Sequence, residues 1–172
     1  MQQQLAILPL PLAIDKDHVL GRVPVVTVVG RELVMPFPLA GIRVELNKTM
    51  EEGAGIYRSE ESLKRTCENI RQLKRRFQQA GISDKSNSFN TELIAALELG
   101  FILDAAEAVA FSALARQESR GSHQRTDFPR RDDQRYLKHS LAYRTDNDPR
   151  IDYLDVVITR WPPGERVYGA SK

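Results

Sequence analysis

The residues best able to do chemistry are charged side chains gathered in one segment, residues 116–150. This segment holds nine basic and six acidic residues, and it places a histidine, His123, between Arg120 and Arg125. Two arginines beside a histidine could bind a dicarboxylate, because a guanidinium pairs with a carboxylate through two parallel hydrogen bonds. The charges alternate in sign along the chain, however, so neighbouring charges can neutralise each other. We therefore predict that most of these residues form a structural network and not a catalytic site.

The predicted network holds the C-terminal tail against the rest of the fold. Its members are Glu118, Ser119, Arg120, Gly121, His123, Arg125, Asp127, Arg131, Asp132, Asp133, Lys138 and His139. Ser119 and Gly121 are expected to help the chain turn out of the preceding helix. His139 follows Lys138 in a predicted strand, and we expect it to be packed or hydrogen-bonded and not to bind a metal.

Two other kinds of site are not expected. The single cysteine, Cys67, cannot form an intramolecular disulfide, and with three scattered histidines it gives no metal-ligand cluster. No G-x-G-x-x-G motif follows a predicted strand, as a dinucleotide site would require. Gly53 and Gly55 give only a G-x-G, and the acidic residues before it would repel a phosphate. We therefore predict a turn there, and no metal or cofactor bound by this chain.

Charge and hydropathy exclude several classes of partner. The net charge of +2 gives no general attraction to nucleic acid, and the aromatic residues of the charged segment lie among acids, which weakens any stacking site. The most apolar stretch, residues 93–114, carries Glu98, Asp104 and Glu107, which are costly inside a bilayer, so it is expected to be buried in protein. We predict a cytoplasmic protein without a direct membrane span. It could still reach the inner face of the cell membrane through other subunits.

Three helices are predicted before the charged segment. A short amphipathic helix at Ile42–Met50 is expected to stop at Gly53 and Gly55. Ser59 should cap a second helix that ends near Gly81. Its apolar stripe comprises Leu63, Cys67, Ile70, Leu73 and Phe77, opposite a basic face.

The third helix should begin after Asn90. Apolar and small residues surround it on all sides, so we expect it to be the central and most buried helix. Short connections between the three helices favour an antiparallel bundle. Beyond Gly121 the helical period disappears, and residues 137–144 and 151–158 are predicted to pair as a hairpin across the turn-rich sequence Thr145–Pro149.

The predicted fold is therefore mainly α: an antiparallel three-helix bundle followed by an extended C-terminal tail with a short β-hairpin. Residues 1–40 would be a proline-rich leader of extended pieces or short strands, residues 41–120 the bundle, and residues 121–172 the tail packed on the bundle. Five of the nine prolines fall in the leader, and this composition does not separate a partly ordered leader from a strand pair or from translated sequence of another reading frame.

The same segments resemble a known family when they are read in order. The chain contains A-R-x-E-S-R-G-x-H-x-R-x-D from Ala115, then R-D-D from Arg131 and L-K-H-S-L-A-Y from Leu137. Further matches are M-E-E-G-x-G-I-Y-R from Met50, N-T-E-L from Asn90 and P-P-x-x-R-V-Y-G from Pro162. These blocks resemble the C-terminal domain of succinate dehydrogenase and fumarate reductase flavoprotein subunits over residues 41–170. The ending favours the fumarate reductase branch.

The resemblance implies an oxidoreductase whose cofactor-binding modules would not fit into a chain of this length. Family members carry FAD in a large flavin-binding module, with a capping module, ahead of this segment, and 172 residues hold neither. The implied role is a docking and structural domain that is not catalytic alone, in a complex that interconverts fumarate and succinate. Its implied partners are the flavin-binding module or subunit and an iron–sulfur subunit, with the charged network as the docking residues. A stand-alone protein-interaction module and a fragment of a broken gene remain as alternatives.

Overall fold

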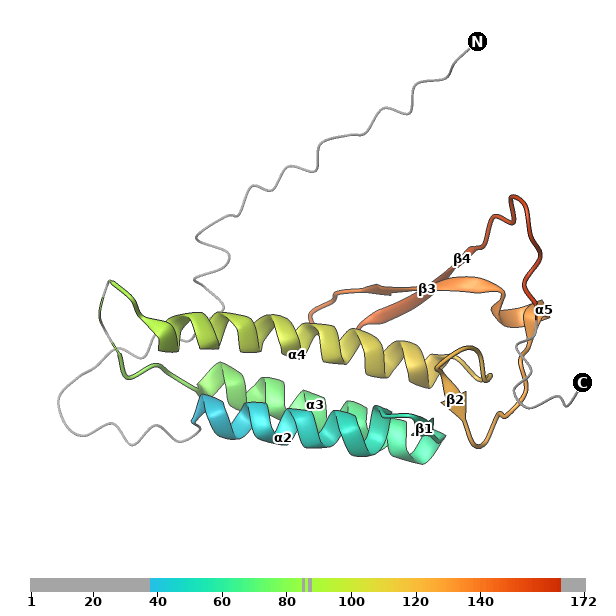
Figure 1. Ribbon diagram of the computed structural model, residues 1–172. Helices are drawn as coiled ribbons and strands as arrows, with labels where there is room; N and C mark the ends of the chain where they lie inside the picture. Colours follow the sequence, from blue (N-terminus) through green and yellow to red (C-terminus); the bar gives the residue numbers. More distant parts are fainter. Residues whose placement is uncertain (1–37, 85, 87, 165–172) are drawn as a thin grey trace, which may run out of the picture.

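The computed structural model describes residues 38–84, 86 and 88–164, and it shows three long helices followed by a small hairpin (Figure 1). The helices are α2 (Leu39–Ala54), α3 (Glu60–Gln79) and α4 (Thr91–Ala115). Successive helices run in opposite directions and pack side by side. The predicted mainly helical fold, a bundle followed by a hairpin, is confirmed. The leader predicted for residues 1–40 lies outside the described residues, except that α2 already begins at Leu39.

The helix ends follow the capping residues that the sequence contains. Ser59 caps α3 with a reciprocal pair of hydrogen bonds: its hydroxyl accepts from the Ser62 backbone, while the Ser62 hydroxyl accepts from the Ser59 backbone. The Asn90 side chain caps α4 by accepting from the Leu93 backbone at 2.8 Å. Both predicted caps are confirmed. Each depends only on residues three positions apart, which is why the sequence could predict it.

The first helix differs from its prediction at its C-terminal end. Gly53 does not stop α2 but lies inside it and is buried. A Cβ atom built at this position would overlap the hydroxyl oxygen of Thr66 on α3. Gly53 therefore allows α2 and α3 to approach each other closely. The helix α2 ends one residue later, at Ala54, before Gly55.

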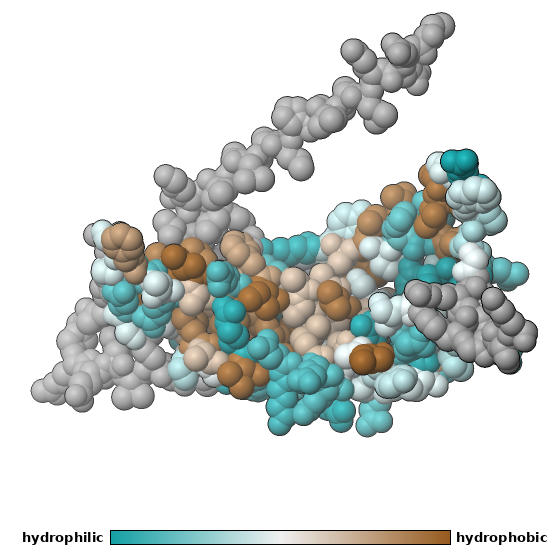
Figure 2. All heavy atoms as spheres, in the orientation of Figure 1, coloured by the Kyte–Doolittle hydropathy of each residue, from teal (hydrophilic) through white to brown (hydrophobic). Residues whose placement is uncertain are grey.

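The core lies between the three helices. It includes Ile42 and Leu46 of α2, Leu99 and Leu103 of α4, and the whole predicted stripe of α3. The third helix, α4, contacts both other helices and both strands of the hairpin, but it is not covered on all sides. Ile94 (56% exposed), Phe101 (57%), Ile102 (38%) and Val109 (49%) remain open to solvent, and Figure 2 shows apolar side chains on the surface along this helix.

The tail contains the predicted hairpin, with strands slightly shorter than expected. Strand β3 (Lys138–Tyr143) pairs antiparallel with β4 (Arg150–Asp155), and Tyr143 lies opposite Arg150. In the connecting turn the Thr145 hydroxyl donates to the Asp148 carbonyl at 2.7 Å. The hairpin packs on α4. The sequence ending after Gly164 lies outside the described residues.

Two small elements were not predicted. Strand β1 (Tyr57–Arg58) pairs in parallel with β2 (Gln124–Arg125), which joins the α2–α3 connection to the tail. A single helical turn, α5 (Asp133–Tyr136), is capped by the Asp132 side chain and precedes β3. No helix among the described residues is long and apolar enough to cross a bilayer.

Candidate functional site

Glu118 is the centre of the charged cluster that the sequence singles out. Its carboxylate is fully buried, just beyond the end of α4. It accepts from Arg116 at 2.6 Å, from Arg120 at 2.7 Å and from the backbone N–H of Asp132 at 2.8 Å. Burial alone would raise the pKa of Glu118, but these three donors outweigh burial and hold the pKa below its ordinary value. The carboxylate therefore stays ionised and joins the end of α4 to the tail at Asp132.

Arg116 connects this carboxylate to the hairpin. The guanidinium donates to the carbonyls of Tyr136 at 2.7 Å and Lys138 at 2.6 Å, and to the Ser140 hydroxyl at 3.1 Å. It also lies over the rings of Tyr136 and Tyr153. The sequence pattern did not indicate that Arg116 holds β3.

Arg125 and Asp127 form a second ion pair, between α3 and α4, in which the arginine is buried and the carboxylate is partly exposed. Two parallel hydrogen bonds of 2.8 Å join the guanidinium, whose side chain is fully buried, to the carboxylate. Arg125 also donates to the carbonyls of Ala113, Leu114 and Arg116 at the C-terminal end of α4. The arginine lowers the pKa of Asp127 far below its usual range, and a hydrogen bond from the backbone of Glu60 adds to this.

His123 is half-buried and held between Arg58 and Arg116. Arg58 donates to Nδ1 at 2.8 Å, and Nε2 donates to the Arg116 carbonyl at 3.1 Å. Because an arginine can only donate and a carbonyl can only accept, these contacts assign a neutral imidazole with its proton on Nε2. Burial, and then the nearby arginines, lower the pKa of His123. Both ring nitrogens are engaged within the protein.

Three helix ends meet at this side of the bundle, and each has a charge of the favourable sign. Arg58 donates to the last carbonyls of α2, at Ala54 and Gly55. Asp127 lies at the N-terminus of α3, and Arg125 at the C-terminus of α4. Cations stabilise helix C-termini and an anion stabilises a helix N-terminus. The sequence did not reveal that Arg58 links the end of α2 to His123, because these two residues are 65 positions apart.

The remaining predicted residues divide into two groups. Ser119 accepts from the Arg125 backbone at 2.8 Å and donates to the Phe128 carbonyl at 2.9 Å, and Gly121 turns the chain with a φ of 59°. Asp133 accepts from both Arg120 and Arg131, at 2.5 and 2.9 Å. These residues join the cluster.

Lys138 and His139 lie apart from the cluster at the level of their side chains. The Lys138 ammonium lies 3.3 Å from the exposed carboxylate of Asp155 on the neighbouring strand. His139 is exposed, so of the two alternatives expected for it, packed or hydrogen-bonded, the structure contradicts the first. As a result, only the Lys138 backbone carbonyl, and not its charge, belongs to the Arg116 contacts.

The cluster can therefore brace the fold, but its geometry is unlike that of an anion site. Arg116, Arg120 and Arg125 all point their guanidinium groups at protein carboxylates or carbonyls. A dicarboxylate would have to displace buried bonds that each arginine already makes. Among the described residues there is also no group of three potential metal ligands.

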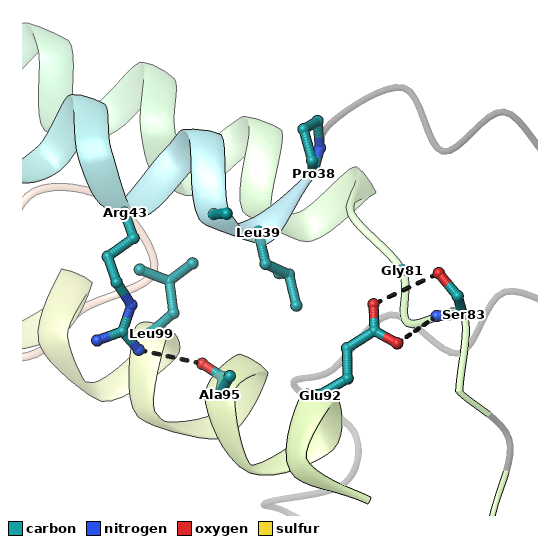
Figure 3. A pocket seen from close by; sticks show the side chains of 9 residues that line it. Pro38, Leu39, Arg43, Gly81, Ser83, Glu92, Ala95 and Leu99 are labelled. Carbon is teal, nitrogen blue, oxygen red and sulfur yellow. Dashed lines mark hydrogen bonds between the residues drawn. The ribbon is translucent and has the colours of Figure 1, made fainter.

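A shallow apolar groove of about 390 Å³ lies at the opposite end of the bundle, where α2 and α4 begin (Figure 3). Leu39 and Leu99 line its floor, and Pro38 lies at its edge. The Glu92 carboxylate at one end accepts from the backbone of Ser83 at 2.8 Å. Pro38, the first residue that the structure describes, therefore lies next to the first turns of α4.

Comparison with known proteins gives the family. Residues 43–168 match the model described as the fumarate reductase flavoprotein C-terminal domain. The chain belongs to this family. The predicted resemblance is thereby confirmed, including the preference for the fumarate reductase branch among named relatives.

Relatives and solved structures agree on the same segment. The fumarate reductase flavoprotein subunit of Mycobacterium tuberculosis is 55% identical over 132 residues, and that of Escherichia coli is 49% identical over 135. A mitochondrial succinate dehydrogenase flavoprotein subunit of Oryza sativa is 36% identical over 138 residues. An E. coli quinol fumarate reductase structure superposes with a TM-score of 0.77 and 41% identity, covering 91% of this chain and 26% of its own.

The match covers most of this chain but little of each relative. The three sequence relatives are matched over 76–77% of this chain and only 22–23% of their own length. The chain therefore corresponds to a C-terminal quarter of a flavoprotein subunit.

Proposed function

We propose that this chain serves as the C-terminal docking and structural domain of a fumarate reductase type flavoprotein subunit. The observation that carries the proposal is the family match over residues 43–168, at 55% identity to a named fumarate reductase flavoprotein subunit. The assembly would interconvert fumarate and succinate, with FAD held by a flavin-binding module and not by residues 38–164.

The geometry of the charged cluster supports a structural part for these residues. Hydride exchange with a dicarboxylate needs a flavin, a proton carrier and cations free to hold two carboxylates. His123 is neutral with both nitrogens bonded, and the arginines around it are directed at protein acceptors. The role proposed for the cluster is to hold the ends of α2, α3 and α4 and the tail in one arrangement.

The proposed partners are the flavin-binding module and an iron–sulfur subunit of the same complex. Two structures similar to this chain are titled as quinol fumarate reductases, one of them with menaquinol molecules. A place in such a complex would put the chain in the cytoplasm, at the inner face of the membrane through other subunits.

A chimera tests the proposal. The segment of the M. tuberculosis fumarate reductase flavoprotein subunit that matches this chain is replaced by residues 43–168. We expect the purified chimera to retain flavin and to reduce fumarate with an artificial electron donor. The matched control is the same subunit ending before the replaced segment, which should lose flavin or aggregate.

The isolated chain gives the complementary measurement. Purified alone, it should be colourless and should not reduce fumarate. A yellow protein that keeps flavin through purification would contradict the proposal, as would a folded chimera that retains no flavin.

A further inference from the structure

Arg58 joins the connection between α2 and α3 to the start of the tail. Its guanidinium donates to Nδ1 of His123 at 2.8 Å, and its backbone carbonyl accepts from the N–H of Thr126 at 2.8 Å. Strands β1 and β2 lie side by side here, and the pairing of Tyr57–Arg58 with Gln124–Arg125 is called the β1–β2 joint. Each strand has only two residues, so its backbone gives few hydrogen bonds. The joint therefore depends strongly on Arg58.

The guanidinium of Arg58 is held without a carboxylate. Among the residues that the structure describes, its partners are the carbonyls of Ala54 and Gly55, at 3.0 and 2.9 Å, and the imidazole of His123. Arg116 and Arg125, by contrast, each contact a carboxylate. Arginine keeps its charge at every pH that a folded protein meets. A permanent cation is thus held against a neutral imidazole.

The imidazole can accept from this cation only while it is neutral. Nε2 of His123 donates to the Arg116 carbonyl, so an added proton must go to Nδ1, at which the Arg58 guanidinium already points. Two N–H donors and two positive charges would then face each other over 2.8 Å. Arg125 donates to the same Arg116 carbonyl at 3.1 Å and adds a further cation. A protonated His123 therefore cannot keep its contact with Arg58.

The surrounding charges do not compensate for an added proton. The groups whose charges act on His123 are three cations: Arg58 of β1, Arg116 at the end of α4 and Arg125 of β2. The carboxylates of the cluster, Glu118 and Asp127, are already bonded by arginines. The pKa of each carboxyl group is held below its ordinary value, so both remain ionised at pH 5. Mild acid thus changes the charge of His123 and leaves these ion pairs intact.

We propose that the Arg58–His123 contact is an acid-sensitive switch: protonation of His123 at Nδ1 expels Arg58 and opens the β1–β2 joint, while the three helices stay packed. The inference concerns contacts within this chain and does not rest on the function proposed above. His123 is only half-buried, so a proton can reach it. No histidine occurs between residues 39 and 115, so the helices themselves lack a group that ordinarily titrates near neutral pH.

Hydrogen exchange of the full chain tests the switch. Peptide mass spectrometry at pH 7.5 and 5.0, with exchange times scaled for the intrinsic effect of pH, compares peptides that cover residues 120–126 with peptides from α3. We expect the protection of residues 120–126 to fall at least fivefold at pH 5.0, while α3 keeps its protection. Unchanged protection of residues 120–126 at pH 5.0 overturns the inference. So does an equal loss in α3, because the whole bundle would then be unfolding.

Two substitutions identify the titrating pair. His123→Gln can keep both hydrogen bonds without titrating, so its residues 120–126 should be equally protected at both pH values. Arg75→Gln removes an exposed arginine near the other end of α3 and is the matched control, which should respond to acid as the unmodified chain does. An acid response that survives in His123→Gln assigns the opening to another group and overturns the inference.

An NMR titration gives a second measurement that does not need His123 to be replaced. In Arg58→Gln the side-chain carbonyl of glutamine can accept from a protonated Nδ1. The imidazole of His123 should therefore gain its proton at a higher pH in this variant than in the unmodified chain, as followed by its ¹⁵N chemical shifts. The same titration curve in both chains would show that Arg58 does not oppose the proton, which contradicts the switch.

Discussion

Glu118 is the residue whose charge the tail needs most, because a fully buried carboxylate is matched by two guanidinium groups and a backbone N–H. Removing one partner of a buried ion pair leaves the other charge uncompensated. We expect Glu118→Gln to lower the free energy of unfolding by about 3 kcal/mol, measured by urea denaturation.

The control for this substitution is a carboxylate in an exposed pair. Asp155, whose side chain is 86% exposed and lies near Lys138, should tolerate Asp155→Asn with a loss below about 0.5 kcal/mol. A loss of the same size for both variants would show that burial of the Glu118 charge does not matter.

His123 should make stability depend on pH in a window where the carboxylates do not. Its pKa is lowered in the folded state from about 6.5, so the unfolded chain binds the proton more readily. Stability is complete above pH 6.5 and falls as the pH drops below it. We expect the free energy of unfolding to fall between pH 7.5 and 5.5, because the unfolded chain gains the proton first. His123→Gln can keep both hydrogen bonds without titrating, so urea denaturation of this variant should show a flat profile over that range.

Phe89 is a bulky residue in a backbone conformation that favours glycine and asparagine. Its φ is 54° and its side chain is 98% exposed, just before the cap of α4. A non-glycine residue in the left-handed region costs roughly 1 kcal/mol or more. Because asparagine tolerates this region, Phe89→Asn should raise the free energy of unfolding by about 1 kcal/mol. Thermal unfolding checks this. The control is Phe101→Asn, which also removes an exposed ring but lies in a helix, and it should not stabilise the chain.

At the scale of elements, two glycines of α2 should respond to alanine in opposite ways. At Gly53 an added methyl group would overlap Thr66, so Gly53→Ala should destabilise the protein by about 2 kcal/mol although alanine is the better helix former. At Gly41 the nearest atom is Cγ of Pro38 at 3.5 Å, and Gly41→Ala should stabilise by up to about 1 kcal/mol. Thermal unfolding midpoints of the two variants decide this, and shifts of the same sign would contradict the close helix contact.

The elements that the sequence predicts are those specified by residues close together in the chain. The caps at Ser59 and Asn90, the stripe of α3 and the turn at Thr145 all depend on spacings of a few positions. The β1–β2 pair was missed because each strand has two residues, too few for a period, and because Tyr57 meets Gln124 only through the tertiary fold. Gly53 was misread for the same reason, since its neighbour Thr66 lies on another helix.

At the scale of the whole molecule, α4 contacts both other helices and the hairpin, as a central helix should, yet some of its apolar side chains stay exposed. The apolar composition of the helix was interpreted correctly, but the described chain does not contain enough protein to cover it. Motif order identified the family, because the blocks are specific. The alternating signs of the charged residues favoured a structural network over a catalytic site, because neighbouring charges can neutralise each other. They did not indicate which atoms each arginine contacts, because most of those partners are backbone carbonyls.

The bundle and the hairpin are held together by a small number of arginines. We therefore expect the hairpin to open without unfolding of the bundle. An isolated two-stranded hairpin is marginal in water, so β3 and β4 depend on α4, on Arg71 and on Arg116. Arg71 pairs with Asp148 in the turn at 2.6 and 2.7 Å, while Arg116 holds the other end of β3 through two carbonyls.

We expect Arg116→Gln to speed hydrogen exchange of the β3 and β4 amides at least tenfold while amides of α3 keep their protection. Arg150→Gln, which removes an exposed arginine within the hairpin itself, is the control and should change these rates little. If α3 loses protection together with the hairpin, the two parts unfold as one unit, and the tail is as much a part of the core as the helices are.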